Sequence, residues 1–233
     1  MAKSVVLVPR EALSQYPQAS FMTAQEQSTY EEACSRFKGK AKESLNISLN
    51  GLNLWKILLL NQEGVRTATL QELDLIADID PQFLEGFYAD APAVALRSAS
   101  DSYNSNDYVA KQLAKLIKRK SFPHTVIVEG LGIKSDSRSS YGLSFVKTER
   151  LKVIEAPDFD RTNNERRFSR INPDYTIEFD ERGAKTLYTG DNGISRLDLY
   201  RLNVGSNSKN LAGPGEVGRV VRVASVARSR AKK

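Results

Sequence analysis

Three pairs of closely spaced acidic residues could hold a divalent cation: Asp78 with Asp80, Asp158 with Asp160, and Asp180 with Glu181. Two carboxylates on one extended segment can share a hard cation such as Mg²⁺. The enzymatic alternative is therefore a metal-dependent nuclease or hydrolase that uses Asp158, Asp160, Glu178 or Asp180. The acid and the lysine between Glu178 and Lys185 are wrongly spaced for such a nuclease. We interpret these acids as turn-forming and predict no metal site.

Other kinds of catalytic or cofactor site need combinations of residues that this sequence does not offer. His124 is the single histidine and Cys34 the single cysteine, so an internal disulfide and a cysteine-based zinc site are excluded. A serine or cysteine hydrolase would need His124 as its base, and no G-x-S-x-G motif accompanies it. Gly213 to Gly218 matches G-x-G-x-x-G, but a dinucleotide site needs a helix after that motif, and residues 217–223 have the composition of a strand. We predict no catalytic residue and no cofactor.

Basic residues beside aromatic ones carry the remaining chemical signal. Such pairs on strands can bind single-stranded nucleic acid, and protein interfaces use them equally. The stretch from Glu216 to Lys233 adds six basic residues against one acidic residue. Acids interleave with the arginines of residues 160–181, so a mixed solvent face is the alternative there. The predicted residues for binding nucleic acid or a partner are Arg161, Arg166, Arg167, Arg170, Arg196, Tyr200, Arg219, Arg222, Arg228, Arg230, Lys232 and Lys233.

Two further patterns could contact nucleic acid. The segment from Thr69 to Asp90 could be a helix-turn-helix, but its second helix would carry no lysine or arginine to face DNA, so we favour a helical hairpin packed into the core. The segment from Asn104 to Lys120 has an apolar stripe on one face and lysines on the others. The lysine face could bind phosphate. We interpret it as the solvent-exposed face of a helix that links the two halves of the fold.

Local signals place the elements around these residues. Capping-box patterns at Thr23 and Thr69 predict helices, and Asp80-Pro81 predicts a short further helix that Pro92 closes. Asn106 is the expected N-cap of the basic helix. Residues 125–128 are β-branched, which predicts the first of about eight short strands after the basic helix. Asn192-Gly193 predicts a hairpin between strands at 184–189 and 194–203.

We therefore predict an α+β fold in which a mainly helical N-terminal half packs on a C-terminal half formed by an antiparallel β-sheet or small barrel. The expected regions are a mainly helical region over 1–103, a linking amphipathic helix over 104–123, an antiparallel β region over 124–227 and a basic tail over 228–233. A hydrophobic content of 40% with 27% charged residues is typical of soluble globular proteins.

These observations predict a non-enzymatic binding or structural assembly protein. It would engage nucleic acid or an acidic protein surface through the β half and the basic C-terminal tail, in a homo-oligomer or a larger particle such as a ribonucleoprotein or virus particle. The longest apolar run, near Leu54 to Leu60, is far shorter than the about 20 residues of a membrane span. We also expect no secretory signal, since the first residues lack the pattern of a basic segment followed by an apolar one. We expect no membrane contact and a location in the cytoplasm or within a soluble assembly.

Overall fold

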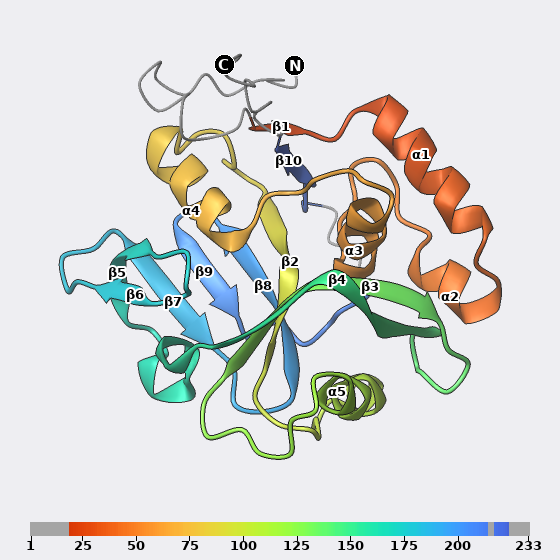
Figure 1. Ribbon diagram of the computed structural model, residues 1–233. Helices are drawn as coiled ribbons and strands as arrows, with labels where there is room; N and C mark the ends of the chain where they lie inside the picture. The colour runs from red at the N-terminus through yellow and green to blue at the C-terminus, as the bar shows by residue number, and fades with distance from the viewer. Residues whose placement is uncertain (1–18, 214–216, 224–233) are drawn as a thin grey trace, which may run out of the picture.

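A computed structural model describes residues 19–213 and 217–223, and its centre is an eight-stranded sheet (Figure 1). The strand order is β4-β3-β2-β8-β9-β7-β5-β6. Neighbouring strands run antiparallel except β7 and β9, which are parallel. The strands are β2 (Tyr88–Leu96), β3 (Val126–Ser135), β4 (Leu143–Glu155), β5 (Arg167–Ile171), β6 (Ile177–Phe179), β7 (Lys185–Thr189), β8 (Ile194–Tyr200) and β9 (Asn203–Ser206).

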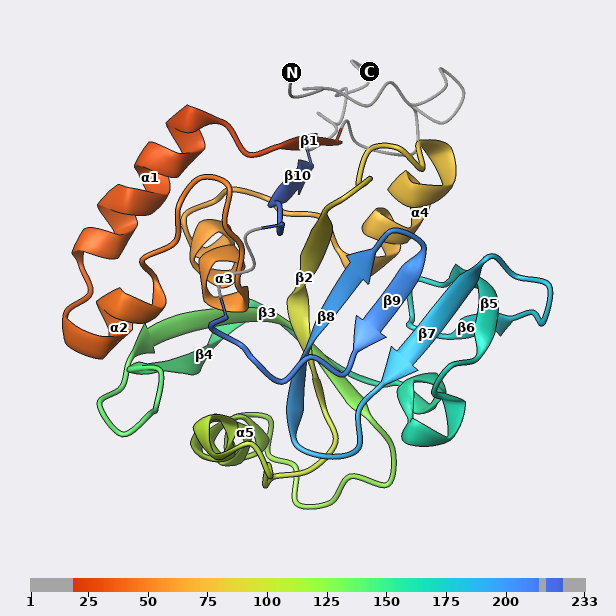
Figure 2. The same cartoon turned by 180° about the vertical axis from the view of Figure 1, so that it is seen from behind.

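The α-helices precede β3 in the chain and lie around the sheet (Figures 1 and 2), while two short 3-10 helices, η1 (Pro157–Phe159) and η2 (Arg161–Asn163), follow β4. The α-helices are α1 (Ala24–Ser35), α2 (Gly39–Ser44), α3 (Leu54–Gln62), α4 (Leu70–Ile79) and α5 (Asn104–Leu116). Both predicted capping boxes are confirmed: Thr23 with Glu26 begins α1, and Thr69 with Glu72 begins α4. Among residues 19–213 and 217–223, no helix combines the length and the apolar composition needed to cross a membrane.

Two apolar cores flank the sheet because the side chains of β2 alternate between its faces. Val94 and Leu96 join the core that contains Trp55 of α3 and the apolar side of α5. Ala91, Ala93 and Ala95 join the other core, with α4 and the strands β7 to β9. The β2 residues from Ala93 to Leu96 are at most 1% exposed. The sheet is therefore covered by packed side chains on both faces at β2.

A second sheet joins segments from near the two ends of the chain. It pairs β1 (Ala19–Phe21) with β10 (Val221–Val223) in antiparallel register. Arg222 of β10 donates to Ser20 of β1 and pairs with Glu26 of α1. This two-stranded sheet holds the start of the described chain against its end.

The predicted arrangement of halves is wrong. β2 comes from the N-terminal half and lies inside the sheet, between β3 and β8, so no helical half packs on a separate C-terminal sheet. Nor is there a closed barrel among the described strands, because β4 and β6 are open edges. The sheet is also not wholly antiparallel. The α+β class itself holds, with strands dominating the C-terminal half. The proposed regional boundaries remain predictions.

Two local predictions also fail. Residues 81–86 form successive turns in place of the helix expected after Asp80, and β2 begins at Tyr88. The sequence of β2 is rich in alanine and contains Pro92, which disfavour strands when taken alone. The expected hairpin around Asn192-Gly193 does not form either, because β9 lies between β7 and β8 in the sheet.

Candidate functional site

The predicted arginines of β5 lie in a lobe of mixed charge at one end of the sheet. The guanidinium of Arg166 lies 3.6 Å from the centre of the Phe179 ring and donates to Asn163. Arg161 pairs with Asp191 at 3.0 Å, while Arg167 and Arg170 are exposed. Residues 157–192 hold eight aspartates and glutamates against six lysines and arginines. The lobe therefore has arginines near aromatic rings and no excess of positive charge.

The other predicted binding residues lie elsewhere and are mostly held within the fold. Arg196 is 9% exposed and pairs with the buried Asp90 at 2.8 Å. Arg219 donates to the carbonyl oxygen of Asn50, and Arg222 pairs with Glu26. The structure does not bring the described members of the set into one surface. Arg228, Arg230, Lys232 and Lys233 lie outside the described residues.

The acidic candidates of the β half bind backbone and side-chain donors of neighbouring loops. Asp158 accepts a hydrogen bond from the Ile177 amide at 2.8 Å. Asp160 accepts from the amide and hydroxyl of Thr125 and contacts His124. Asp180 accepts from the Arg182 amide. Within residues 19–213 and 217–223, no group of three or more His, Cys, Asp or Glu side chains is arranged to hold a metal ion.

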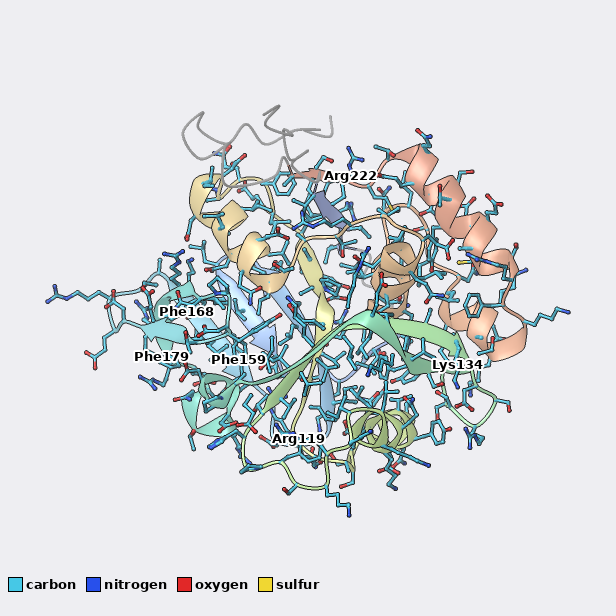
Figure 3. The ribbon with its side chains drawn as sticks, in the orientation of Figure 1. Arg119, Lys134, Phe159, Phe168, Phe179 and Arg222 are labelled. Carbon is cyan, nitrogen blue, oxygen red and sulfur yellow. The ribbon has the colours of Figure 1, made fainter. Side chains whose placement is uncertain are left out.

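Positive charge is concentrated instead between Asn104 and Ala156, where ten lysines and arginines face five aspartates and glutamates. Here α5 packs beside the β3–β4 hairpin, because Val109 and Leu113 are fully buried in the core. That packing leaves a hollow of about 410 Å³ lined by Lys115, Lys134 and Arg138. We call the surface formed by Lys111, Lys115, Lys134 and Arg138 the basic face. Figure 3 shows Lys134 at the β3–β4 end of the molecule, far from Phe179.

Charges within the basic face are only partly compensated. Arg138 donates three hydrogen bonds to Asp136, two from its guanidinium and one from its backbone amide, and Asp136 also accepts one from the Tyr108 hydroxyl at 2.8 Å. These hydrogen bonds hold the pKa of Asp136 far below its usual range, and the bond from the Arg138 side chain has the largest effect. Lys111 pairs with Asp107 one turn away, at 2.6 Å. Lys115 and Lys134 are exposed, and they are the lysines that line the hollow.

Ser144 gives this hollow an unused hydrogen-bonding group. It lies on β4 directly opposite Lys134 of β3. Its side chain is fully buried, and its hydroxyl oxygen has no hydrogen-bond partner among the described residues. A buried hydroxyl without a partner is unusual because its desolvation is uncompensated. Ser144 nonetheless belongs to the wall of the hollow, where a ligand could bond to its hydroxyl once a covering side chain moves aside.

A second unusual group is a pair of aspartates at the centre of the sheet. Asp90 of β2 and Asp198 of β8 are directly opposed in the antiparallel register. Asp90 is 3% exposed, and one of its carboxyl oxygens has no partner in the described part of the chain. Arg196 donates to the other oxygen. Asp198, Arg196, Tyr88 and Tyr200 line a pocket of about 530 Å³.

The surroundings of the aspartate pair raise the pKa of both carboxyl groups. Burial, with the neighbouring charge of Asp90, raises the pKa of Asp198 to about 7, although Arg196 opposes the shift. Burial also raises the pKa of Asp90, again against the effect of Arg196. Two adjacent carboxyls rarely ionise together, because like charges repel in a poorly solvated site. A proton on Asp198 would give the unpartnered oxygen of Asp90 a donor.

Sequence reasoning found some of these residues and missed others. Arg196 and Tyr200 are among the predicted binding residues, and they line one pocket with Asp198, two residues from each along β8. Asp90 was missed, because its pairing with Asp198 depends on the order of strands in the sheet. Lys134, Arg138 and Ser144 were also missed as site residues. The available signal was that Lys115, Lys134 and Arg138 lie within one helix–hairpin segment of the chain.

The comparisons with known proteins add no assignment to this geometry. No protein-family model, no curated protein and no solved structure matches the chain.

Proposed function

We propose that the protein is a non-enzymatic binding protein that engages a nucleic acid through the phosphate backbone, using the basic face. The observation that carries the proposal is the hollow that Lys115, Lys134 and Arg138 line together with Ser144, whose hydroxyl has no partner among the described residues. Lysine ammonium groups and a hydroxyl are common phosphate ligands. The surface lies on α5 and the first hairpin of the β half, where the positive charge of the described chain is concentrated.

The composition of the basic face favours a polyanion over an acidic protein surface. Protein interfaces usually have an apolar core depleted of charged residues. Leu116 is the apolar residue that lines the hollow, and it is half-buried against the core. Large exposed apolar side chains of the described chain, such as Leu49 and Tyr200, do not line it. Phosphate contacts need no apolar core, because release of counterions supplies much of their affinity.

The test measures affinity for a single-stranded and a double-stranded oligonucleotide as a function of salt. We expect the variant Lys115→Glu/Lys134→Glu to bind the oligonucleotide at least tenfold more weakly. The slope of log affinity against log salt concentration should fall by the equivalent of about two phosphate contacts. Arg167→Glu/Arg170→Glu is the matched control, since it reverses two exposed charges on β5. Equal losses in both variants, or no binding by the wild type, would contradict the proposal.

The C-terminal tail and assembly belong to the same proposal. A chain that ends at residue 223 lacks the four basic residues Arg228, Arg230, Lys232 and Lys233. If the tail adds phosphate contacts, its removal should lower the salt slope independently of the basic-face variant. Light scattering of the full chain, alone and with oligonucleotide, measures whether a homo-oligomer or larger particle forms. A complex with an acidic protein but not with nucleic acid would support the acidic-partner alternative.

A further inference from the structure

A separate cavity opens where the sheet departs from regular pairing. It has a volume of about 600 Å³ and lies between the end of α3, the α3–α4 connection and the β3–β4 hairpin. Cavities of about 300–1,000 Å³ are the usual size of small-molecule sites. None of its lining residues lines the hollow of the basic face.

Two irregularities at the same level of the sheet create this cavity. The register of β3 with β4 shifts between Glu129 and Leu131, and Gly130 there has a φ of +67°. The register of β2 with β8 shifts between Asp90 and Val94, which includes Pro92. Gly130 and Pro92 both line the cavity. Strand bulges recur beside binding sites, because they interrupt the ladder and redirect side chains.

Apolar side chains contribute to the interior of the cavity, and several of its polar groups are already hydrogen-bonded within the fold. Leu58, Leu131 and Pro92 provide the apolar lining. The Gln62 side chain accepts a hydrogen bond from the Ile133 amide at 3.0 Å, and Asn61 donates to the Thr67 hydroxyl at 2.6 Å. A ligand would gain little by competing for these groups. The part of the ligand that enters the cavity should therefore be apolar.

The rim of the cavity carries cations that remain accessible. Arg150 and Lys152 of β4 are exposed, and the Lys152 side chain keeps 71% of its accessible surface. Lys152 makes a long ion pair of 3.8 Å with Glu129, whose other oxygen accepts from the Tyr175 hydroxyl at 2.7 Å. Arg66 also lines the cavity and pairs with Glu72. The exposed guanidinium of Arg150 and the ammonium of Lys152 suit a carboxylate or another single anionic group.

We propose that this cavity binds a small amphipathic organic anion, with its apolar body against Leu58 and Leu131 and its anionic group at Arg150 and Lys152. The site is independent of the nucleic-acid proposal, since it lies outside the basic face. A medium-chain carboxylate has the required chemistry: a flexible apolar body and one terminal charge.

The test titrates the full chain with octanoate by calorimetry, and with octanamide as the uncharged counterpart of the same length. We expect one octanoate per chain and at least tenfold weaker binding of octanamide. Arg150→Glu/Lys152→Glu should weaken octanoate to the level of octanamide. Two matched controls, Arg167→Glu/Arg170→Glu and Lys134→Glu/Arg138→Glu, should bind octanoate as the wild type does.

Amide chemical shifts of the wild-type protein provide a test that needs no variant. Octanoate should shift the resonances of Gly130, Leu131 and Thr148, and leave those of Lys115 and Ser144 in place. Equal affinity for octanoate and octanamide would overturn the proposal. So would shifts confined to the basic face, or absence of saturable binding. Loss of oligonucleotide binding in the Lys115→Glu/Lys134→Glu variant tests a different surface, so the two proposals can fail separately.

Discussion

The side chain of Gln112 hydrogen-bonds to both backbone groups of Phe145: its amide nitrogen donates to the carbonyl oxygen at 2.8 Å, and its amide oxygen accepts from the N–H at 3.2 Å. β4 is an edge strand, and exposed edges are templates for pairing with another chain. Gln112 therefore supplies from α5 the hydrogen bonds that a neighbouring strand would make at this position. The helix covers part of the edge as well as filling the core.

Replacing Gln112 by alanine should expose the Phe145 backbone. We expect the free energy of unfolding to fall by about 1–3 kcal/mol, because two partly buried backbone groups lose their partners. We also expect association that increases with protein concentration. Chemical denaturation and light scattering measure the two effects. Lys111→Ala, one residue earlier on the same helix, should change neither by a comparable amount; aggregation of both variants would contradict the edge-covering role.

The aspartate pair predicts an inverted pH dependence of stability. The pKa of Asp198 is about 7 in the folded state and about 4 in an unfolded chain. The folded state therefore binds this proton more tightly, so its stabilising contribution is complete below pH 4 and is lost as pH rises to 7. The loss is on the order of 3 kcal/mol.

Asp198→Asn keeps the hydrogen-bonding shape and removes the titration. Its free energy of unfolding should fall less than that of the wild type between pH 4 and 7. Subtracting the two curves cancels the carboxylates elsewhere, such as Asp136, whose lowered pKa acts in the opposite direction. Parallel curves for the two proteins would show that Asp198 is ionised throughout this range. Asp180→Asn, at an exposed turn, is the control.

A buried ion pair joins α4 to β7. Lys185 is 4% exposed and lies 2.7 Å from Asp74, which is 2% exposed, and 2.8 Å from Asp78. Lys185→Met should lower the free energy of unfolding by about 3–5 kcal/mol, because Asp74 would remain buried without its partner. The double variant Lys185→Met/Asp74→Leu should recover much of this loss.

The exposed ion pair of Arg161 with Asp191 is the matched comparison for Lys185. Its side chains retain 72% and 63% of their accessible surface. Arg161→Met should cost less than about 1 kcal/mol, since solvent screens exposed pairs. Thermal or denaturant unfolding of the four proteins checks both expectations, and similar costs for the buried and the exposed pair would contradict them.

Alanine substitution at Gly130 and at Gly64 distinguishes the cost of a left-handed backbone conformation from the cost of a steric clash. Both have positive φ, at +67° and +86°. A Cβ on Gly130 would lie 2.2 Å from the Arg150 carbonyl oxygen, whereas a Cβ on Gly64 would meet nothing within 4 Å. Gly64→Ala should cost about 1 kcal/mol from the left-handed conformation alone. Gly130→Ala should cost more than about 3 kcal/mol in denaturant unfolding, because the bulge must also move; equal costs would show that the bulge adapts freely.

Local signals in the sequence predicted local structure well. The capping boxes at Thr23 and Thr69 lie within four residues of chain, so tertiary packing does not alter them. The N-cap expected at Asn106 is wrong, since α5 begins at Asn104. Asn106 is instead fully buried, where it accepts from the Tyr141 hydroxyl at 2.6 Å and donates to the Lys209 carbonyl oxygen at 2.7 Å. Its role depends on distant segments that its neighbours in sequence do not reveal.

The unexpected start of β2 at Tyr88 and the missed sites have the same physical origin. β2 is a strand because β3 and β8 pair with it and because its small alanines pack against the core that contains α4. Asp90 and Asp198 are far apart in the chain and meet only through that pairing. Lys115 and Lys134 likewise come together through the burial of α5. In each case the interaction is non-local, and hydrophobic periodicity alone does not encode which strands are neighbours.

The pairing of Ala19 with Val223 gives the fold a contact that spans almost the whole described chain. Closing so large a loop is entropically costly until the segments between are ordered. We expect β1 and β10 to join last during folding and to separate first during unfolding. Amide hydrogen exchange should therefore be faster in β1 and β10 than in β2 and β8. The amides of β1 and β10 should exchange at similar rates, because the two strands separate from each other in one event. Opening this small sheet would uncouple the beginning and the end of the chain while leaving the central sheet intact.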